Sequence, residues 1–221
     1  QYLHKVTGRK WVSHDVEQET GCGVVPITYD DKNFVHALQW AIGLEWFLHV
    51  DDPWRLALST DHPNGASFLA YPKVIALLMD RGHRADSLKA LRERARERTG
   101  LADLGREYSL FEIAIITRAG PARLLGLDRK GHLGPGADGD VTIYAPDDDK
   151  ERMFALPRYL IKAGTVVVDD GELCCAPTGE TFFVSPEYDP GAIPEIEAAF
   201  ARASSIQFAN FPVVDLSLIH I

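Results

Sequence analysis

The sequence predicts an α/β protein in which a largely helical portion comes first and a β-rich portion follows. Three observations support this class. Apolar residues recur at helical spacing after Asn33, which is a suitable N-cap. A short apolar segment, residues 55–60, runs into a polar turn, as a buried strand does. Beyond Gly126, β-branched segments alternate with turn residues, and Asp170-Gly171 is typical of a hairpin.

The same patterns predict the individual elements. We expect helices over residues 34–50, 69–79, 87–98, 110–118, 122–125 and 193–203. The first should be buried, and Ser109 with Glu112 forms a capping box for the fourth. We expect strands over residues 55–60, 141–144, 159–162, 165–168 and 181–184. Residues 11–16 fit either a strand or a short helix, and the portions should meet between residues 131 and 139.

Composition excludes several classes of function. The 221 residues carry a net charge of −9, which argues against nucleic-acid binding, because that binding depends on Lys and Arg. The arginines of residues 92–98 alternate with glutamates and predict a solvated helix face. No apolar run reaches the ~18 residues of a membrane span. Cys22, Cys174 and Cys175 lack a zinc-binding spacing, so we interpret them as reduced thiols of a cytoplasmic protein.

The candidate for chemistry is the segment Ser59-Thr60-Asp61-His62-Pro63-Asn64-Gly65. Polar groups that follow a barrel strand lie at the end where β/α barrels have their active sites. A carboxylate there, Asp61, can bind a metal ion and transfer protons. The structural alternative is a simple turn, because Asp and Asn are common turn formers, and His62 can serve as a hydrogen-bonding loop residue.

A second motif, residues 118–144, reads as a helix, a glycine-rich turn and a strand. Gly134, Gly136 and Gly139 approach a dinucleotide-binding spacing. That fingerprint follows a strand and opens a helix, whereas the order here is reversed. We therefore assign these glycines a structural role in the turn.

Several motifs together resemble one family. They are Ser59 to Gly65, Arg106 to Leu110, Glu112 to Gly120, Pro121 to Leu127, Gly131 to Val141 and Trp11 to Gly21. The chain resembles the A-type subunit of formylmethanofuran dehydrogenase and of formyltransferase/hydrolase complexes, in the amidohydrolase superfamily. The resemblance implies the C-terminal part of a TIM-like β/α barrel over residues 1–130. Part of a small β-sandwich domain with a late helix would follow over residues 131–214. We interpret residues 215–221 as a non-native tail.

The resemblance also implies the chemistry. Such a subunit hydrolyses, or forms, the formamide of N-formylmethanofuran at a binuclear zinc centre, with formate as product or substrate. Asp61 would bind metal and shuttle protons, and His62 and Asn64 would contact substrate. The other ligands are expected before Gln1, so we expect this chain alone to be inactive. Expected partners are the other subunits of such a complex. The alternatives are another cyclic-amide amidohydrolase and a non-catalytic scaffold subunit.

Overall fold

The structure is a computed structural model that describes residues 3–5, 11–13, 29–30, 32–62, 66–180, 189–203 and 207–210. It combines helices with antiparallel sheets and divides into two compact units. The larger unit comprises residues 25–180, and the other comprises residues 1–24 and 181–221. The expected boundary between residues 131 and 139 falls inside the larger unit, and the expected division into three parts stays a prediction.

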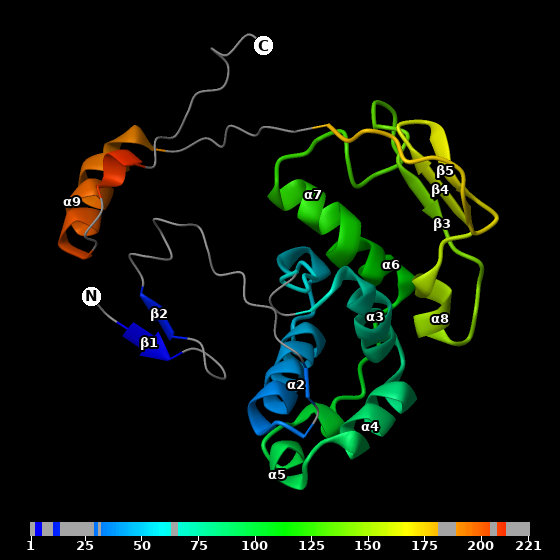
Figure 1. The fold of residues 1–221 in the computed structure, drawn as a ribbon, viewed down its shortest axis with the longest axis horizontal. Coiled ribbons are helices and arrows are strands. Elements are labelled where there is room, and N and C mark those ends of the chain that lie inside the picture. The colour runs from blue at the N-terminus through cyan, green and yellow to red at the C-terminus, as the bar shows by residue number, and fades with distance from the viewer. Residues whose placement is uncertain are drawn as a thin grey trace. The chain divides into compact units, whose positions relative to one another are not determined.

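Helix α2 spans Phe34–His49 and begins where the sequence predicts (Figure 1). The Asn33 side chain accepts hydrogen bonds from two backbone N–H groups of the first turn. The helix is buried along one face only, because the large residues Ile42 and Trp46 are 40% and 65% exposed. The buried residues of the helix are Ala37, Ala41, Leu44 and Leu48. The two small alanines allow neighbouring elements to pack closely.

A series of short helices follows α2 along the chain. They are η1 Pro53–Arg55, η2 Phe68–Ala70, α3 Tyr71–Met79, α4 Arg81–Ala90, α5 Glu93–Arg96 and η3 Leu101–Asp103. The helix expected over residues 87–98 is wrong in its bounds, since α4 begins earlier and ends at Ala90. Asp80 caps α4 by accepting the His83 N–H at 2.8 Å. Leu91 then takes an extended conformation and is buried, which separates α4 from α5.

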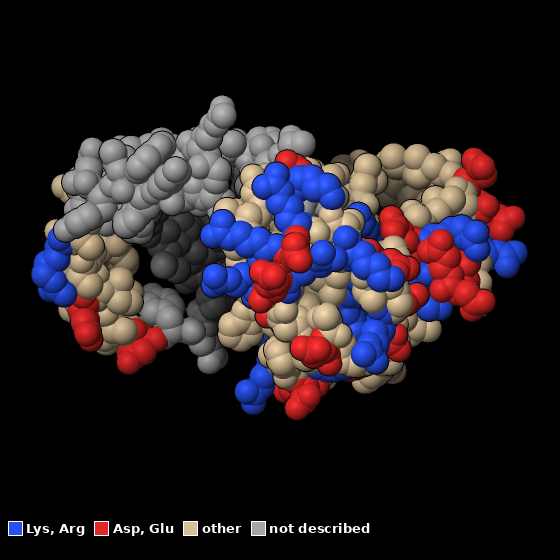
Figure 2. Space-filling model, turned by 90° about the horizontal axis from the view of Figure 1, so that it is seen from below, with Lys and Arg blue, Asp and Glu red and all other residues tan. Residues whose placement is uncertain are grey.

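The charged residues of α5 lie on the surface, as the sequence predicts. Glu93, Arg94 and Arg96 are exposed, while Ala95 between the two arginines is buried. Figure 2 shows Lys and Arg interleaved with Asp and Glu over the face seen there. Within the part of the chain that the structure describes, no helix is long and apolar enough to cross a membrane.

The strand expected over residues 55–60 is not formed. Residues 53–55 make a 3-10 turn, and residues 56–60 are extended without a paired strand in the described part of the chain. A strand needs a neighbouring strand to satisfy its backbone groups. Here the Leu58 N–H instead donates to the carbonyl of Ile116 at 2.8 Å, in a helical segment.

A continuous helical segment follows, built from α6 Leu110–Ala114, the π turn η4 Ile115–Ala119 and α7 Gly120–Leu124. The predicted capping box of Ser109 and Glu112 is confirmed. The expected break at Gly120-Pro121 is absent. The wider turn accommodates Pro121, because the Gly120 N–H bonds the carbonyl five residues back, at Ile115.

The β-rich part is a four-stranded antiparallel sheet. Its strands are β3 Val141–Ile143, β4 Tyr159–Lys162, β5 Thr165–Asp169 and β6 Glu172–Leu173, paired in that order. The predicted hairpin at Asp170-Gly171 is confirmed by the pairing of Val168 with Leu173. Both turn residues have positive φ, 47° and 87°, which matches the preference of Asp-Gly for such turns. Cys174 and Cys175, just beyond β6, are free thiols as expected.

Helix α8, Lys150–Ala155, was not predicted and joins the sheet region to the helices. It packs against α3, and Figure 1 shows it beside that helix and next to the sheet. Asp149 caps it by accepting the Arg152 N–H at 3.0 Å, and Phe154 contacts the main core. Asp149, the last residue of the acidic run 147–149, thus serves as the N-cap of α8.

The other unit contains a short hairpin, in which β1 Leu3–Lys5 pairs with β2 Trp11–Ser13. Of the strand and the short helix that residues 11–16 could form, the structure has a strand at residues 11–13. It also contains the helices η5 Pro190–Ala192, α9 Ile193–Ala203 and η6 Phe208–Asn210. The bounds of α9 match the prediction. The expected strand 181–184 and the expected tail 215–221 lie outside the described residues.

Gly131 lies where the glycine-rich turn touches α7, and Gly131→Ala is expected to destabilise the unit by roughly 2–4 kcal/mol. Its φ is +77°, and an added Cβ would lie 2.7 Å from the Cβ of Ala122. Gly136 is a matched control, since its φ is +85° but a Cβ there would meet open space. Urea unfolding should show a cost of about 1 kcal/mol for Gly136→Ala. Equal costs for the two variants would refute the close contact.

Candidate active site

The segment that leads to Asp61 is held by helices on one side. The Leu58 N–H is bonded to Ile116, and the Tyr71 hydroxyl donates to the Leu58 carbonyl at 3.4 Å. Burial then alternates along the extended segment. Leu58 and Thr60 are buried, whereas Ala57, Ser59 and Asp61 are exposed. Alternation of this kind directs Leu58 and Thr60 toward the core and Ala57 and Ser59 toward solvent, and the exposed Asp61 follows.

Two hydrogen bonds, one to a backbone carbonyl and one to a side-chain hydroxyl, hold the chain around Asp61. The Ala66 N–H donates to the Thr60 carbonyl at 2.9 Å, and the Asp61 N–H donates to Ser59 Oγ at 3.2 Å. Asp61 has a φ of +50°, a left-handed conformation that Asp tolerates better than most residues. Asp61 therefore follows an apolar segment as expected, but that segment is not a strand, and the role of Asp61 in a site stays a prediction.

His62 stacks on an aromatic ring that the sequence reasoning missed. The ring centroids of His62 and Phe68 are 3.9 Å apart, with an angle of 20° between their planes. Both side chains are exposed, Phe68 by 63%. An aromatic residue six positions after His62 was the available sequence signal. Asn64 lies outside the described residues, so its expected contact with substrate stays a prediction.

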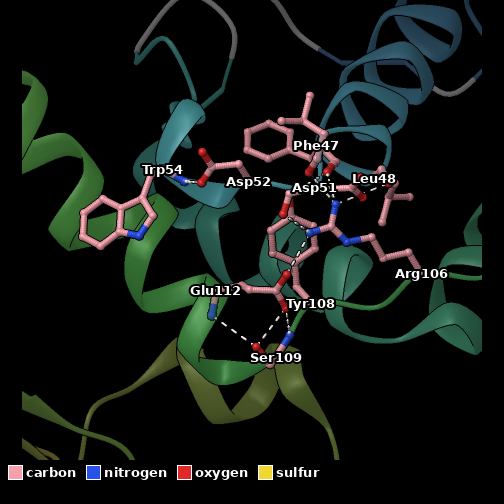
Figure 3. Close-up of polar contacts among 10 residues, drawn as sticks. Phe47, Leu48, Asp51, Asp52, Trp54, Arg106, Tyr108, Ser109 and Glu112 are labelled. Carbon is pink, nitrogen blue, oxygen red and sulfur yellow. Dashed lines mark hydrogen bonds and ion pairs between the residues drawn. The ribbon is translucent and has the colours of Figure 1, made fainter.

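A polar network fixes the chain just before this segment (Figure 3). The Arg106 guanidinium donates to the carbonyl of Val50 at 2.5 Å and to Glu112 Oε1 at 2.7 Å. The Tyr108 hydroxyl donates to the carbonyl of Phe47 at 2.5 Å. These contacts satisfy carbonyls at the C-terminal end of α2, where a cation also opposes the helix dipole. The end of α2 and the start of α6 are thereby joined.

The charges in this network support one another. Burial raises the pKa of Glu112, but hydrogen bonds from Ser109 and Arg106 outweigh it, so the net shift is downward. Burial also raises the pKa of Tyr108, which keeps its hydroxyl protonated as a donor. The network is therefore a structural support for the site, with Glu112 ionised and paired.

A second charged cluster anchors the glycine-rich turn to the sheet. Lys130 Nζ lies 2.7 Å from Asp138 and 2.6 Å from Asp140, and Lys162 Nζ lies 2.8 Å from Asp140. Hydrogen bonds to both aspartates raise the pKa of Lys130. Burial raises the pKa of Asp140, and its bonds to the two lysines lower it far more. These contacts agree with a structural role for the turn.

Elsewhere in the larger unit, an open cavity of about 440 Å³ lies among α3, α4 and α8. Its polar lining includes Asp80, His83 and Glu151, and it does not contain Asp61 or His62. Asp80 already caps α4, and His83 Nε2 lies 3.8 Å from Glu151. The cavity is therefore separate from the predicted site.

Within the described residues, no three His, Cys, Asp or Glu side chains are grouped so that they could hold a metal ion. An exposed carboxylate at the end of an anchored segment fits one position of a metal centre, since carboxylate oxygen is a zinc ligand.

Thr60 carries a buried hydroxyl whose oxygen makes no hydrogen bond in the described structure. Such a group costs free energy that folding does not recover. We therefore expect Thr60→Val to leave the free energy of unfolding unchanged or to raise it by up to ~1 kcal/mol. Thr60→Ser, which keeps the hydroxyl and loses the methyl group, should lower it. Thermal unfolding of both variants checks this, and a large loss in Thr60→Val alone would reveal a partner for the hydroxyl.

The sequence over most of this chain matches a known class of hydrolase. The amidohydrolase family profile matches residues 3–168, and the chain belongs to the amidohydrolase family. Members of this family are generally metal-dependent hydrolases.

Individual proteins of this family are similar to the chain over most of its length. The chain is 46% identical to the A-type subunit of the formyltransferase/hydrolase complex Fhc of Methylorubrum extorquens, over 94% of this chain and 38% of that protein. It is 42% identical to Protein FwdA of Methanocaldococcus jannaschii, over 96% of this chain and 40% of that protein. The chain thus spans about 40% of the length of these curated relatives. A dihydroorotase of Halobacterium salinarum is 42% identical over 45 residues, 20% of this chain and 11% of that protein.

A solved structure agrees with these relatives. The crystal structure of the formyltransferase/hydrolase complex FhcABCD from Methylorubrum extorquens, in complex with methylofuran, superposes with a TM-score of 0.70. The superposed residues are 42% identical and cover 87% of this chain and 36% of that chain. The likeness therefore extends to the three-dimensional arrangement of most of this chain.

Proposed function

We propose that this chain is part of a hydrolase subunit that cleaves, or forms, the formamide bond of N-formylmethanofuran, with formate as product or substrate. The observation that carries the proposal is the 46% identity to a formyltransferase/hydrolase subunit over 94% of the chain. A solved complex of that kind holds methylofuran. In this proposal the helical portion is the last part of a TIM-like β/α barrel, and the β-rich portion is part of a small sandwich domain. The partners are the other subunits of such a complex.

Asp61 has the central role in the proposed reaction. Water attacks the formyl carbon, and Asp61 accepts the proton that the water loses. The C–N bond then breaks, and Asp61 delivers that proton to the leaving nitrogen, which gives formate and the free amine. Asp61 is exposed, which leaves its carboxylate accessible for this transfer. His62 and Asn64 are the proposed contacts to the substrate.

We further propose that the metal is zinc and that Asp61 is one of its ligands. Bound zinc would polarise the formyl carbonyl and lower the pKa of water to ~7. Asp61 is suited to both roles, because a carboxylate that binds metal lies beside the water that it deprotonates.

Metal removal tests this proposal in the complete protein. We expect a chelator to abolish formate release from N-formylmethanofuran and added zinc to restore it, with zinc content rising in parallel. A protein that hydrolyses a cyclic amide but releases no formate would instead support the cyclic-amide alternative. A metal-free protein that binds its partner subunits and releases no formate would support the scaffold alternative.

A further inference from the structure

The ring pair of His62 and Phe68 is unusual in its exposure. The rings are nearly parallel at 3.9 Å, yet Phe68 is 63% exposed and His62 is exposed as well. Aromatic rings that only stabilise a fold normally bury most of their surface. This pair therefore leaves flat aromatic surface open to solvent.

The pair is also held in place by its surroundings. Phe68 begins η2, whose first turn is capped by Ser67 Oγ accepting the Leu69 N–H at 3.3 Å. The hydrogen bond from the Ala66 N–H to the Thr60 carbonyl brings the two ends of the turn together. A surface fixed in advance binds a ligand with less loss of conformational freedom.

The third observation is that the ring pair begins at the residue next to the candidate catalytic residue in the sequence. His62 directly follows Asp61, and consecutive Cα atoms are ~3.8 Å apart. Asp61, His62 and Phe68 are all exposed, so one substrate in solution has access to the carboxylate and to the rings. Aromatic faces attract other planar rings in offset stacks.

We infer that the His62–Phe68 pair is a stacking platform for the furan ring of the substrate, and that Phe68 determines selectivity for ring-bearing formamides. This inference rests on the proposed function. The alternative is that the rings only stabilise the turn around Asp61. The two accounts differ, because a turn-stabilising ring affects all formamide substrates alike, whereas a platform affects only those that carry a ring.

The experiment uses the complete protein with the subunits that copurify with it. The kcat/KM for N-formylmethanofuran is divided by that for a ring-free N-alkylformamide. Phe68→Leu removes the ring and keeps apolar bulk, so this ratio should fall about tenfold, mainly through KM for the furan substrate. Phe68→Tyr retains a ring and should restore the ratio. Leu69→Ala is the matched control, since Leu69 is 88% exposed and outside the ring pair, and its ratio should equal that of the unmodified protein.

Binding of methanofuran itself supplies a readout apart from turnover. Titration calorimetry should show about tenfold weaker binding in Phe68→Leu and recovery in Phe68→Tyr. One outcome is that the unmodified protein deformylates N-formylmethanofuran while Phe68→Leu keeps the same selectivity ratio and the same methanofuran affinity. That result would overturn the stacking platform and leave the proposed function in place. Equal losses for both substrates would also overturn it in favour of turn stabilisation. An unmodified protein without formate release would overturn the proposed function and the platform together.

Discussion

Asp61→Asn in the complete protein is expected to lower kcat for formate release by about 10²–10⁴-fold. The substitution keeps the size of the side chain and removes the carboxylate that accepts and delivers the proton. Because Asp61 is exposed and its N–H bond to Ser59 involves only the backbone of Asp61, the fold should be retained. If Asp61 is also a metal ligand, zinc content should fall in the same variant.

A matched substitution separates this effect from a general change of charge. Asp103, in η3, is exposed as Asp61 is, so Asp103→Asn makes the same chemical change elsewhere in the same unit. Asp103→Asn should retain the kcat and zinc content of the unmodified protein. Full activity in Asp61→Asn would remove Asp61 from the site.

Arg84→Met is expected to lower the free energy of unfolding by about 3–5 kcal/mol. Arg84 is 1% exposed, and its guanidinium donates to the carbonyls of Leu77 at 2.8 Å, Leu104 at 3.1 Å and Arg106 at 2.9 Å. Burial lowers its pKa, and the charge of Glu107 partly opposes that shift. Met fills most of the same space but leaves the three carbonyls without a donor.

Urea unfolding measures this loss. Arg81→Met is the control, because Arg81 lies on the exposed side of the same helix and its loss should change the free energy of unfolding by less than ~0.5 kcal/mol. A variant as stable as Arg81→Met would contradict the structural role of the buried guanidinium.

Local signals allowed the best sequence predictions. The Asn33 cap, the Ser109–Glu112 capping box and the Asp170-Gly171 hairpin each depend on residues close together in the chain. The late helix, residues 193–203, was likewise predicted from its own pattern.

The features that were missed depend on distant partners. Arg84 appears in the sequence as one more charged helical residue, and only the carbonyls of residues 77, 104 and 106 explain its burial. The segment 55–60 has the composition of a strand, yet strand formation requires a neighbour that the segment's own sequence does not specify. The contact of Phe68 with His62 likewise requires the turn that brings residues 60 and 66 together.

We propose that this chain supplies the Asp61-bearing part of a hydrolase that acts on formylmethanofuran. The most direct test is a graft. The chain replaces the matching 38% of the homologous subunit in the Fhc complex of Methylorubrum extorquens, and the assembled complex is assayed for formate release from the formylated furan substrate. We predict that the grafted complex releases formate and that Asp61→Asn in the graft abolishes release. A grafted complex that assembles and binds zinc but releases no formate would contradict the account.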